Sequence, residues 1–306
     1  MPAELVAVTG ATGFVGQTLL DRLRLRGHDV RALVRRPQKE RLGVEWVAGD
    51  LSDHKALTRL VKGASVVMHI AGAVNAPDEA GFEAANVAGT LNVVEAAAKA
   101  GVGRFIHVSS LSVREPHLSA YGASKLRGEK VVMASGLDWT IIRPPAIYGP
   151  RDTEMFDLFR AAKKGIVPLP PRGRLSVIHV DDLARLMLAL IPSSELVTHQ
   201  IFEPDDGREG GWTHAEFAKA IGWAVGRRVL PMHFHPALLR AGARLDGMLR
   251  GAGAKLTADR VGYMCHPDWR VTAEHAVPAE VWKPKVPTRE GLRSAVDWYR
   301  MNGWLK

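Results

Sequence analysis

The sequence predicts an α/β fold: a doubly wound parallel sheet accompanied by a smaller, mostly helical C-terminal lobe. Three observations support this prediction. Short apolar segments typical of buried strands alternate with helix-period segments through the first half of the 306 residues. A glycine-rich turn joins the first of these strands to the first helix. After Pro150 the alternation gives way to short segments broken by Gly and Pro.

The elements follow one another in an order that fits such a sheet. Helices are expected at 86–100 and 120–134, between strands. A later helix should run through Ile191, with Asp181 or Asp182 as its N-cap. The predicted sheet domain therefore comprises 1–150 and 174–203, and the lobe comprises 151–173 and 204–306. The strand candidates are 5–8, 30–34, 44–47, 65–70, 104–108, 139–142 and 177–180.

The turn at residues 9–16 reads TGATGFVG and places three glycines at intervals of three. Between a buried strand and a helix, such a turn directs the backbone N–H groups of the helix N-terminus at an anion, which the helix dipole also attracts. Glycines allow the tight turn and the close approach of a pyrophosphate. The alternative is a glycine-rich turn that binds nothing.

Tyr121 and Lys125 lie four residues apart in a predicted helix, so they share one face. A nearby cation lowers the pKa of a tyrosine, which can then exchange a proton with a substrate oxygen. Ser110 ends the preceding strand and could hydrogen-bond the same oxygen, with Ser109 as its competitor. An ordinary exposed Tyr/Lys pair is the alternative interpretation.

Composition restricts the class of protein. A hydrophobic content of 46% and a charged content of 24% are typical of a globular protein. The single cysteine, Cys265, allows no internal disulfide and suits the reducing cytoplasm. We find no signal peptide or membrane-spanning stretch, and therefore expect a cytoplasmic protein without stable membrane insertion. The net charge of +9 comes without a dense basic run, so we expect no nucleic-acid partner.

Together these motifs resemble the short-chain dehydrogenase/reductase superfamily, in particular its extended and atypical members with an epimerase/dehydratase-like, Rossmann-type fold. The resemblance covers nearly the whole chain. Residues 9–16 resemble the family's G-x-x-G-x-x-G turn, and 143–150 resemble its R-P-x-x-x-Y-G-P segment. Further matching segments are 49–51, 69–72, 86–90 and the terminal residues 290–305.

The resemblance implies roles for individual residues. Tyr121 would be the catalytic acid/base, Lys125 its partner and a ribose ligand, and Ser110 the partner of the substrate oxygen. Asn86 would be an indirect helper, or alternatively would cap its helix. The implied cofactor-binding residues are Gly10, Thr12, Gly13, Phe14, Val15, Gly16, Arg35, Arg36, Asp50, Leu51, Ile70, Ala71, Gly72, Ser109, Tyr121, Lys125, Pro144 and Ile147.

Charge after the second strand predicts the choice of cofactor. NAD enzymes usually hold the ribose 2′-hydroxyl with an acidic residue there, whereas this strand is followed by Arg35 and Arg36. A guanidinium suits a 2′-phosphate. We therefore expect a preference for NADP(H), with NAD(H) possible. Two solvated surface arginines are the alternative.

We therefore expect an NADP(H)-dependent oxidoreductase that interconverts a carbonyl and an alcohol on a small organic substrate. An epimerase or dehydratase that retains its NAD(P) is the first alternative. Leu175 weakens it, because sugar-nucleotide epimerases generally have an arginine at that position. The second alternative is a non-catalytic NADP(H)-binding protein resembling an accessory subunit of respiratory complex I, although such relatives commonly lack the Ser-Tyr-Lys set.

Three further features of the sequence bear on metals, membranes and assembly. His233 and His235 have no accompanying Cys or carboxylate cluster, so we predict no metal. Residues 238–256 combine apolar residues with Arg and Lys, which favours a lobe or lid helix, with a membrane-surface helix as the alternative. The long helices at 86–100 and 120–134 could form the four-helix interface of a homodimer.

Overall fold

The computed structural model describes residues 3–306, apart from the side chain at position 252, and divides the chain into two compact units. Unit 1 contains the residues through Arg143, Leu183–Glu203 and His275–Trp282. Unit 2 contains Pro144–Asp182, Pro204–Glu274 and Lys283–Lys306. The predicted domain boundaries differ from this division at 144–150, 174–182 and 275–282.

Backbone pairing explains two of these differences. The strands β7 (Ala146–Tyr148) and β10 (Val177–His179) form a parallel pair of their own, so both of their segments belong to unit 2. In unit 1, the N–H of Glu203 donates to the carbonyl oxygen of His275 at 2.8 Å. The segment His275–Trp282 therefore returns to unit 1.

Unit 1 is built on a seven-stranded parallel sheet with the order β11-β6-β5-β4-β1-β2-β3. The order reverses between β1 and β4, and ligands of such sheets bind at that point, beyond the carboxyl ends of the strands. The strands are β1 (Leu5–Thr9), β2 (Asp29–Val34), β3 (Val44–Ala48), β4 (Val66–His69), β5 (Arg104–Val108), β6 (Trp139–Ile142) and β11 (Gln200–Phe202).

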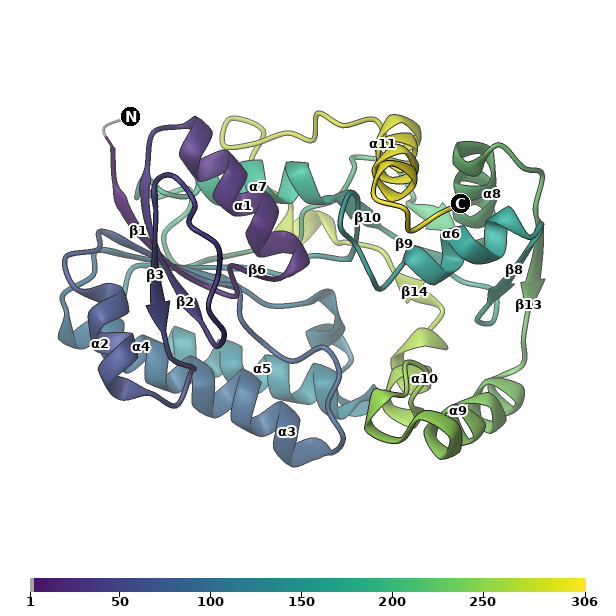
Figure 1. Ribbon diagram of the computed structural model, residues 1–306, viewed down its shortest axis with the longest axis horizontal. Helices are drawn as coiled ribbons and strands as arrows, with labels where there is room; N and C mark the ends of the chain where they lie inside the picture. Colours follow the sequence, from purple (N-terminus) through teal and green to yellow (C-terminus); the bar gives the residue numbers. More distant parts are fainter. Residues whose placement is uncertain (1–2) are drawn as a thin grey trace. The chain divides into compact units, whose positions relative to one another are not determined.

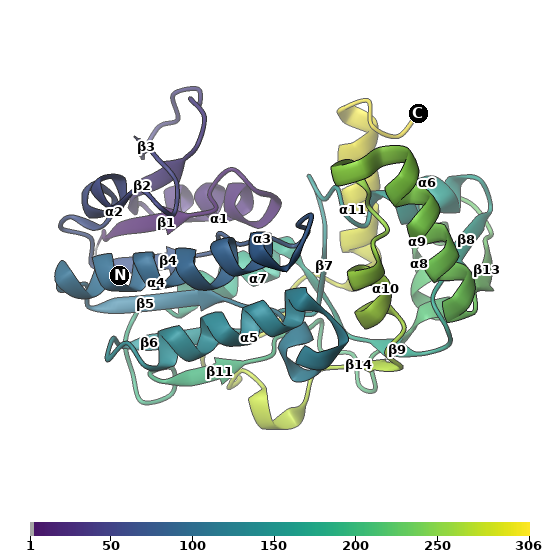
Figure 2. The ribbon, with the colours of Figure 1, turned by 90° about the horizontal axis from the view of Figure 1, so that it is seen from below.

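Helices cover both faces of this sheet, as Figure 1 shows. On one face lie α1 (Phe14–Leu25) and α7 (Val180–Ala189). On the other lie α2 (His54–Val61), α4 (Gly89–Lys99) and α5 (Ala120–Met133), which are in front in Figure 2. Side chains of the latter three helices form one apolar core with the sheet, including Leu57, Val93, Val132, Phe105 and Ile141. The shorter helical elements of unit 1 are α3 (Glu79–Glu83), the π-helical turn η1 (Ala84–Ala88) and the 3₁₀ turns η2 (Leu111–Arg114) and η3 (Pro116–Leu118).

Side-chain caps fix where several of these helices begin. Asp53 accepts the N–H of Ala56 at the start of α2, and Ser119 accepts the N–H of Gly122 at the start of α5. The predicted cap of α7 is wrong, because α7 begins at Val180 and Asp182 lies in its first turn. The Asp182 carboxylate instead accepts backbone N–H groups of the segment at 285–286, within unit 2.

Unit 2 combines short strand pairs with longer helices. The helices α6 (Phe156–Lys163), α8 (His214–Val225) and α11 (Thr288–Met301) pack together around an apolar core that includes Phe159, Phe217 and Tyr299 (Figure 1). A capping box between Thr213 and Glu216 starts α8. The other elements of unit 2 are β8 (Ile166–Leu169), β9 (Arg174–Leu175), β12 (Trp212–Thr213), β13 (Leu230–His233), α9 (Pro236–Arg250), η4 (Gly251–Gly253), α10 (Ala258–Met264), β14 (Asp268–Trp269) and η5 (Ala273–His275), which ends in unit 1.

Candidate active site

The glycine-rich turn holds the N-terminus of α1 close to the end of β4. Gly10 has a φ of +75°, and a Cβ at this position would lie 2.7 Å from the backbone nitrogen of Ala71. A Cβ on Gly16 would lie 2.2 Å from the carbonyl oxygen of Gly10. Larger residues at positions 10 and 16 would therefore force α1 away from the sheet.

The first turn of α1 has the properties of an anion site. In the described chain, no side chain caps this turn and no acidic residue occurs in it. Thr12, Phe14 and Val15 flank the N-cap residue Gly13, where backbone N–H groups need acceptors. A pyrophosphate supplies both acceptor oxygens and the negative charge that the helix dipole favours. The residues at this turn therefore fit a dinucleotide.

Arg35, Arg36 and Asp50 follow the neighbouring strands β2 and β3, and all three are exposed. The carboxylate of Asp50 accepts two hydrogen bonds from Ser52, one from its Oγ (2.6 Å) and one from the backbone N–H of Ser52 (2.8 Å). These bonds, together with a smaller effect of the Arg35 charge, hold the pKa of Asp50 below its usual value. Positive and negative groups thus both border the predicted adenosine end of the site. The predicted neighbour Leu51 is half-buried.

Asn86 fixes the loop that follows β4. Its Oδ1 accepts the N–H of Ala73 at 2.8 Å, and its Nδ2 donates to the carbonyl of Ala73 at 3.0 Å and to the Oγ of Ser124 at 2.9 Å. A Cβ on Gly72 would lie 2.8 Å from Asn86 Oδ1 and 3.6 Å from the Nζ of Lys125. The predicted residues Ile70, Ala71 and Gly72 therefore lie on a loop that Asn86 ties to α5.

The capping alternative for Asn86 is wrong. The helical segment begins at Glu79, and its N-cap is Asp78, which accepts the N–H of Gly81. Asn86 lies inside the π-helical turn η1 and is buried. Single π-turns within helices are frequent at functional sites. The role of indirect helper stays a prediction.

Lys125 brings a buried ammonium group to the carboxyl end of β5. Its side chain is 5% exposed, and its Nζ donates to the carbonyl of Val108 at 2.9 Å. Burial lowers the pKa of Lys125 to about 8, against the opposing effect of Glu129. The nearby rings of His69 and His107 stack at 5.2 Å, and burial lowers the pKa of both below the usual value. Both imidazoles are therefore neutral at pH 7.

Ser110 and Tyr121 approach the same edge from two elements. Ser110 Oγ accepts the N–H of Ser112 at 3.2 Å and lies 3.0 Å from Ser112 Oγ. Tyr121 is in the first turn of α5, and a Cβ on the adjacent Gly122 would lie 2.8 Å from the carbonyl oxygen of Ser112. The start of α5 thus packs against the turn that contains Ser110. Its competitor Ser109 is buried, and its Oγ has no hydrogen-bond partner among the described residues.

Several residues that support this arrangement were not predicted. Gly122 and Gly128 let other backbone segments contact α5, since a Cβ on Gly128 would lie 2.4 Å from the carbonyl oxygen of Asn86. Two glycines inside a helical pattern were the available signal. The Arg143 guanidinium makes two hydrogen bonds to the buried carboxylate of Glu129, at 2.9 and 2.7 Å, and so ties α5 to the end of β6. No local pattern indicated this pair.

The predicted cofactor residues Pro144 and Ile147 belong to unit 2. They are not among the residues that the fold of unit 1 brings to this edge, and their contact with a cofactor stays a prediction. His233 and His235 are also in unit 2.

Comparison with known proteins decides the family. The model of the NAD dependent epimerase/dehydratase family matches residues 6–203. The chain belongs to this family. Its members and structural neighbours place it in the extended short-chain dehydrogenase/reductase superfamily, which confirms the predicted resemblance and the Rossmann-type sheet.

Curated relatives and a solved structure extend this finding. A ceramide reductase of Caulobacter vibrioides is 40% identical over 98% of this chain and 96% of its own length. A 2-alkyl-3-oxoalkanoate reductase of Stenotrophomonas maltophilia is 31% identical over 94% of this chain and 97% of its own. The structure of MoeE5 in complex with UDP-glucose and NAD superposes with a TM-score of 0.75 at 25% identity, over 98% and 99% of the two chains.

This protein is therefore an NAD(P)-dependent oxidoreductase, as the sequence predicts, and it uses a nicotinamide cofactor. Within residues 3–306, no helix has the length and apolar character to cross a membrane.

Proposed function

We propose that this oxidoreductase uses NADPH to reduce a ketone to an alcohol on a substrate that carries an alkyl chain. The observation that supports the proposal is that Lys125 reaches the carboxyl end of β5 and that the start of α5, which contains Tyr121, packs against the turn after Ser110, on the sheet whose glycine turn fits a dinucleotide. Residues at this edge can act on the oxygen of a substrate that lies against a nicotinamide.

The chain's own groups divide the proton chemistry. Ser110 already accepts a hydrogen bond from the Ser112 N–H, and its own O–H can donate a hydrogen bond to the substrate oxygen without giving up its proton. The Tyr121 hydroxyl gives its proton to that oxygen, and the Lys125 ammonium stabilises the phenolate that results. The hydride to the carbonyl carbon would come from NADPH when it is bound at the glycine turn. Asn86 holds the loop after β4 against α5 through its hydrogen bonds to Ala73 and Ser124.

Arg35 and Arg36 support a preference for NADP(H). Both are exposed after β2, where the 2′-position of the adenosine ribose lies in this fold. We expect Arg35→Ser/Arg36→Ser to weaken NADPH binding about tenfold or more and to leave NADH binding nearly unchanged, as titration of each cofactor would measure. Arg24→Ser, at an exposed position in the last turn of α1, is the matched control. Equal NADPH and NADH affinities in the unsubstituted protein would contradict the preference.

The substrate class comes from the relatives and from unit 2. Two reductases that align over more than nine-tenths of this chain are named for ceramide and for 2-alkyl-3-oxoalkanoate, and both names describe compounds with alkyl chains. In β9, Leu175 occupies the position at which sugar-nucleotide epimerases generally have an arginine. An apolar residue there favours an alkyl chain over a nucleotide diphosphate.

The test measures NADPH consumption with a series of ketones of increasing chain length, including 2-alkyl-3-oxo acids, and identifies the alcohol by mass spectrometry. Tyr121→Phe should lower kcat by about 10³-fold or more while the affinity for NADPH stays within about twofold. Ser194→Ala, at an exposed serine of unit 1 outside the proposed site, is the matched control, whereas Ser110→Ala should be impaired. An active Tyr121→Phe enzyme would overturn the assigned role.

An epimerase or dehydratase with retained cofactor is the second candidate, and the 30% identity to a UDP-glucose 4-epimerase of Vibrio cholerae favours it. Such an enzyme returns the hydride to its substrate and consumes no free cofactor. If the protein converted a UDP-sugar without consuming NADPH, the epimerase or dehydratase function would be supported and the proposed reductase function would be rejected.

A further inference from the structure

The helix α9 in unit 2 exposes an apolar surface that the proposed reaction does not use. Buried side chains normally cover the apolar stripe of an amphipathic helix, whereas here that stripe faces solvent. Large apolar residues of α9 with high exposed fractions are Leu238 (61%), Leu245 (57%), Met248 (84%) and Leu249 (76%).

These side chains lie on one face of the helix. At about 100° per residue, Leu238, Leu245 and Leu249 point within about 40° of one another, and Met248 borders them. Ala243, which is buried, points to the other side. The exposed residues therefore form a continuous stripe, which we call the α9 leucine stripe (Leu238, Leu245, Met248 and Leu249).

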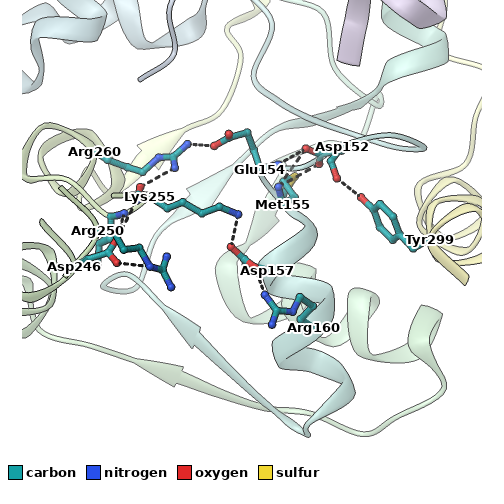
Figure 3. Close-up of polar contacts among 11 residues, drawn as sticks. Asp152, Glu154, Met155, Asp157, Arg160, Asp246, Arg250, Lys255, Arg260 and Tyr299 are labelled. Atoms are coloured by element: carbon teal, nitrogen blue, oxygen red, sulfur yellow. Dashed lines mark hydrogen bonds and ion pairs between the residues drawn. The ribbon is translucent and has the colours of Figure 1, made fainter. Parts of the chain in front are cut away.

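A polar network centred on Asp246 fixes α9 within unit 2, as Figure 3 shows. Asp246 Oδ2 accepts the backbone N–H groups of Lys255 and Leu256 at 2.9 and 3.0 Å. The Nζ of Lys255 pairs with Asp157 of α6 at 2.9 Å. The next helix, α10, is tied to the same region through Arg260 and Glu154. Because this network fixes it within unit 2, α9 keeps the leucine stripe in solvent.

A basic side chain borders the stripe at Met248. Arg244 points about 40° further round the helix than Met248, and Arg240 about 40° beyond Arg244, while Arg250 is at the end of the helix; all three are exposed. Against these three arginines α9 has a single acidic residue, Asp246, which pairs with Arg250 at 3.2 Å. Apolar residues on one face with arginines at its border are typical of helices that lie in the interface of an anionic membrane.

We propose that α9 docks on the surface of a bilayer that contains anionic phospholipids. The leucine stripe enters the boundary between headgroups and acyl chains, Arg244 contacts the lipid phosphates, and Arg240 adds positive charge near the membrane surface. A second copy of the chain fits this surface less well, because a symmetric contact would bring the same arginines of both copies together. The proposal does not depend on the substrate, since it concerns a surface outside the catalytic residues.

The test is sedimentation of the full chain with phosphatidylcholine vesicles, with and without phosphatidylglycerol. We expect binding to the vesicles that contain phosphatidylglycerol and release at high salt. Leu245→Ser/Leu249→Ser should weaken this binding about tenfold or more, and Arg240→Gln/Arg244→Gln should remove the preference for anionic vesicles. Leu25→Ser, at a residue of α1 that is 67% exposed, is the matched control and should bind as the unsubstituted protein does.

Each result bears on the proposal. NADPH affinity and the mass of the particle in solution are measured for every variant, so that misfolding and self-association are detected separately. Vesicle binding that the leucine variant loses, with NADPH affinity retained, supports the proposal. The proposal would be overturned if the protein did not bind anionic vesicles, or if the leucine variant bound them unchanged. It would also be overturned if no vesicle binding occurred and the leucine variant had half the particle mass of the unsubstituted protein. None of these measurements uses the reductase activity, so a failure of the proposed function would be recognised independently.

Discussion

Asp152 is a buried carboxyl group whose titration should be visible in the stability of unit 2. It is 1% exposed and accepts the N–H groups of Glu154 and Met155 just before α6. Burial raises the pKa of Asp152 to about 7, in spite of these hydrogen bonds. The folded state therefore binds the proton more tightly than the unfolded state, so the resulting stabilisation is complete below about pH 4 and is lost as pH rises through 7.

Asp152→Asn should remove this pH dependence, because the amide keeps an acceptor oxygen and does not ionise. The free energy of unfolding of the variant minus that of the unsubstituted protein should increase between about pH 4 and 7, by at most ~1.4 kcal/mol per pH unit. Urea unfolding of both proteins at pH 5 and pH 8 measures the difference. An equal difference at the two pH values would show that the carboxyl group titrates as it does in the unfolded chain.

At the residue scale, local patterns were sufficient to propose the catalytic residues. They did not predict the residues that hold those side chains in place. Tyr121 and Lys125 are one helical turn apart, and Ser110 follows a strand, so short-range rules bring them into view. Asn86 and Ser124 are hydrogen-bonded across 38 positions of sequence. Such a contact depends on how two helices pack, and no periodicity encodes it.

At the scale of an element, Gly128 decides how closely α5 can approach the segment that contains Asn86. A Cβ there would lie 2.4 Å from the carbonyl oxygen of Asn86, a backbone atom that cannot rotate away. Gly128→Ala should lower the free energy of unfolding by about 2–3 kcal/mol, although alanine is the better helix former. It should also lower kcat, because Asn86 moves together with the loop that it fixes.

Gly247→Ala in α9 is the matched control for this substitution. A Cβ on Gly247 meets no atom within 4 Å, so the helix propensity of alanine should act alone and stabilise by about 0.5–1 kcal/mol. Urea denaturation compares the two variants. Equal effects at the two positions would mean that contact with Asn86 does not restrict Gly128.

Element prediction succeeded where the pattern was long and failed where it was short. Six strands of the seven-stranded sheet are apolar runs whose predicted positions agree with the structure to within a residue or two, whereas the three-residue strand β11 was not predicted. The predicted strand at 177–180 is β10, which pairs with β7 outside this sheet. Residues 86–88 of the π-turn η1 were expected as regular helix, because one wider turn leaves the apolar spacing almost unchanged. Strands such as β9 and β12, of two residues each, have no periodicity from which they could be predicted.

At the scale of the whole molecule, the order of the chain differs from the order of its compact units. Unit 1 is assembled from three separate segments, and the segment His275–Trp282 returns to it after more than seventy residues of unit 2. Sequence analysis predicted the first return at residue 174, whereas the chain re-enters unit 1 at Leu183 in α7, and the second return was not predicted. The reason is physical: the second return has no regular element of its own and is fixed by contacts such as that between Glu203 and His275.

The division into units predicts where NADPH stabilises the protein. Ligand at about 100 times its Kd stabilises the folded state that binds it by about 2.7 kcal/mol, which slows exchange through global opening about a hundredfold. Most of the predicted cofactor residues belong to unit 1, so amides of β1, β4 and β5 should be slowed to this extent. Amides in the cores of α6, α8 and α11 should be slowed less, because unit 2 has its own apolar core and can open separately. Hydrogen exchange with and without NADPH measures both sets, and equal slowing would show instead that the two units open in one cooperative step.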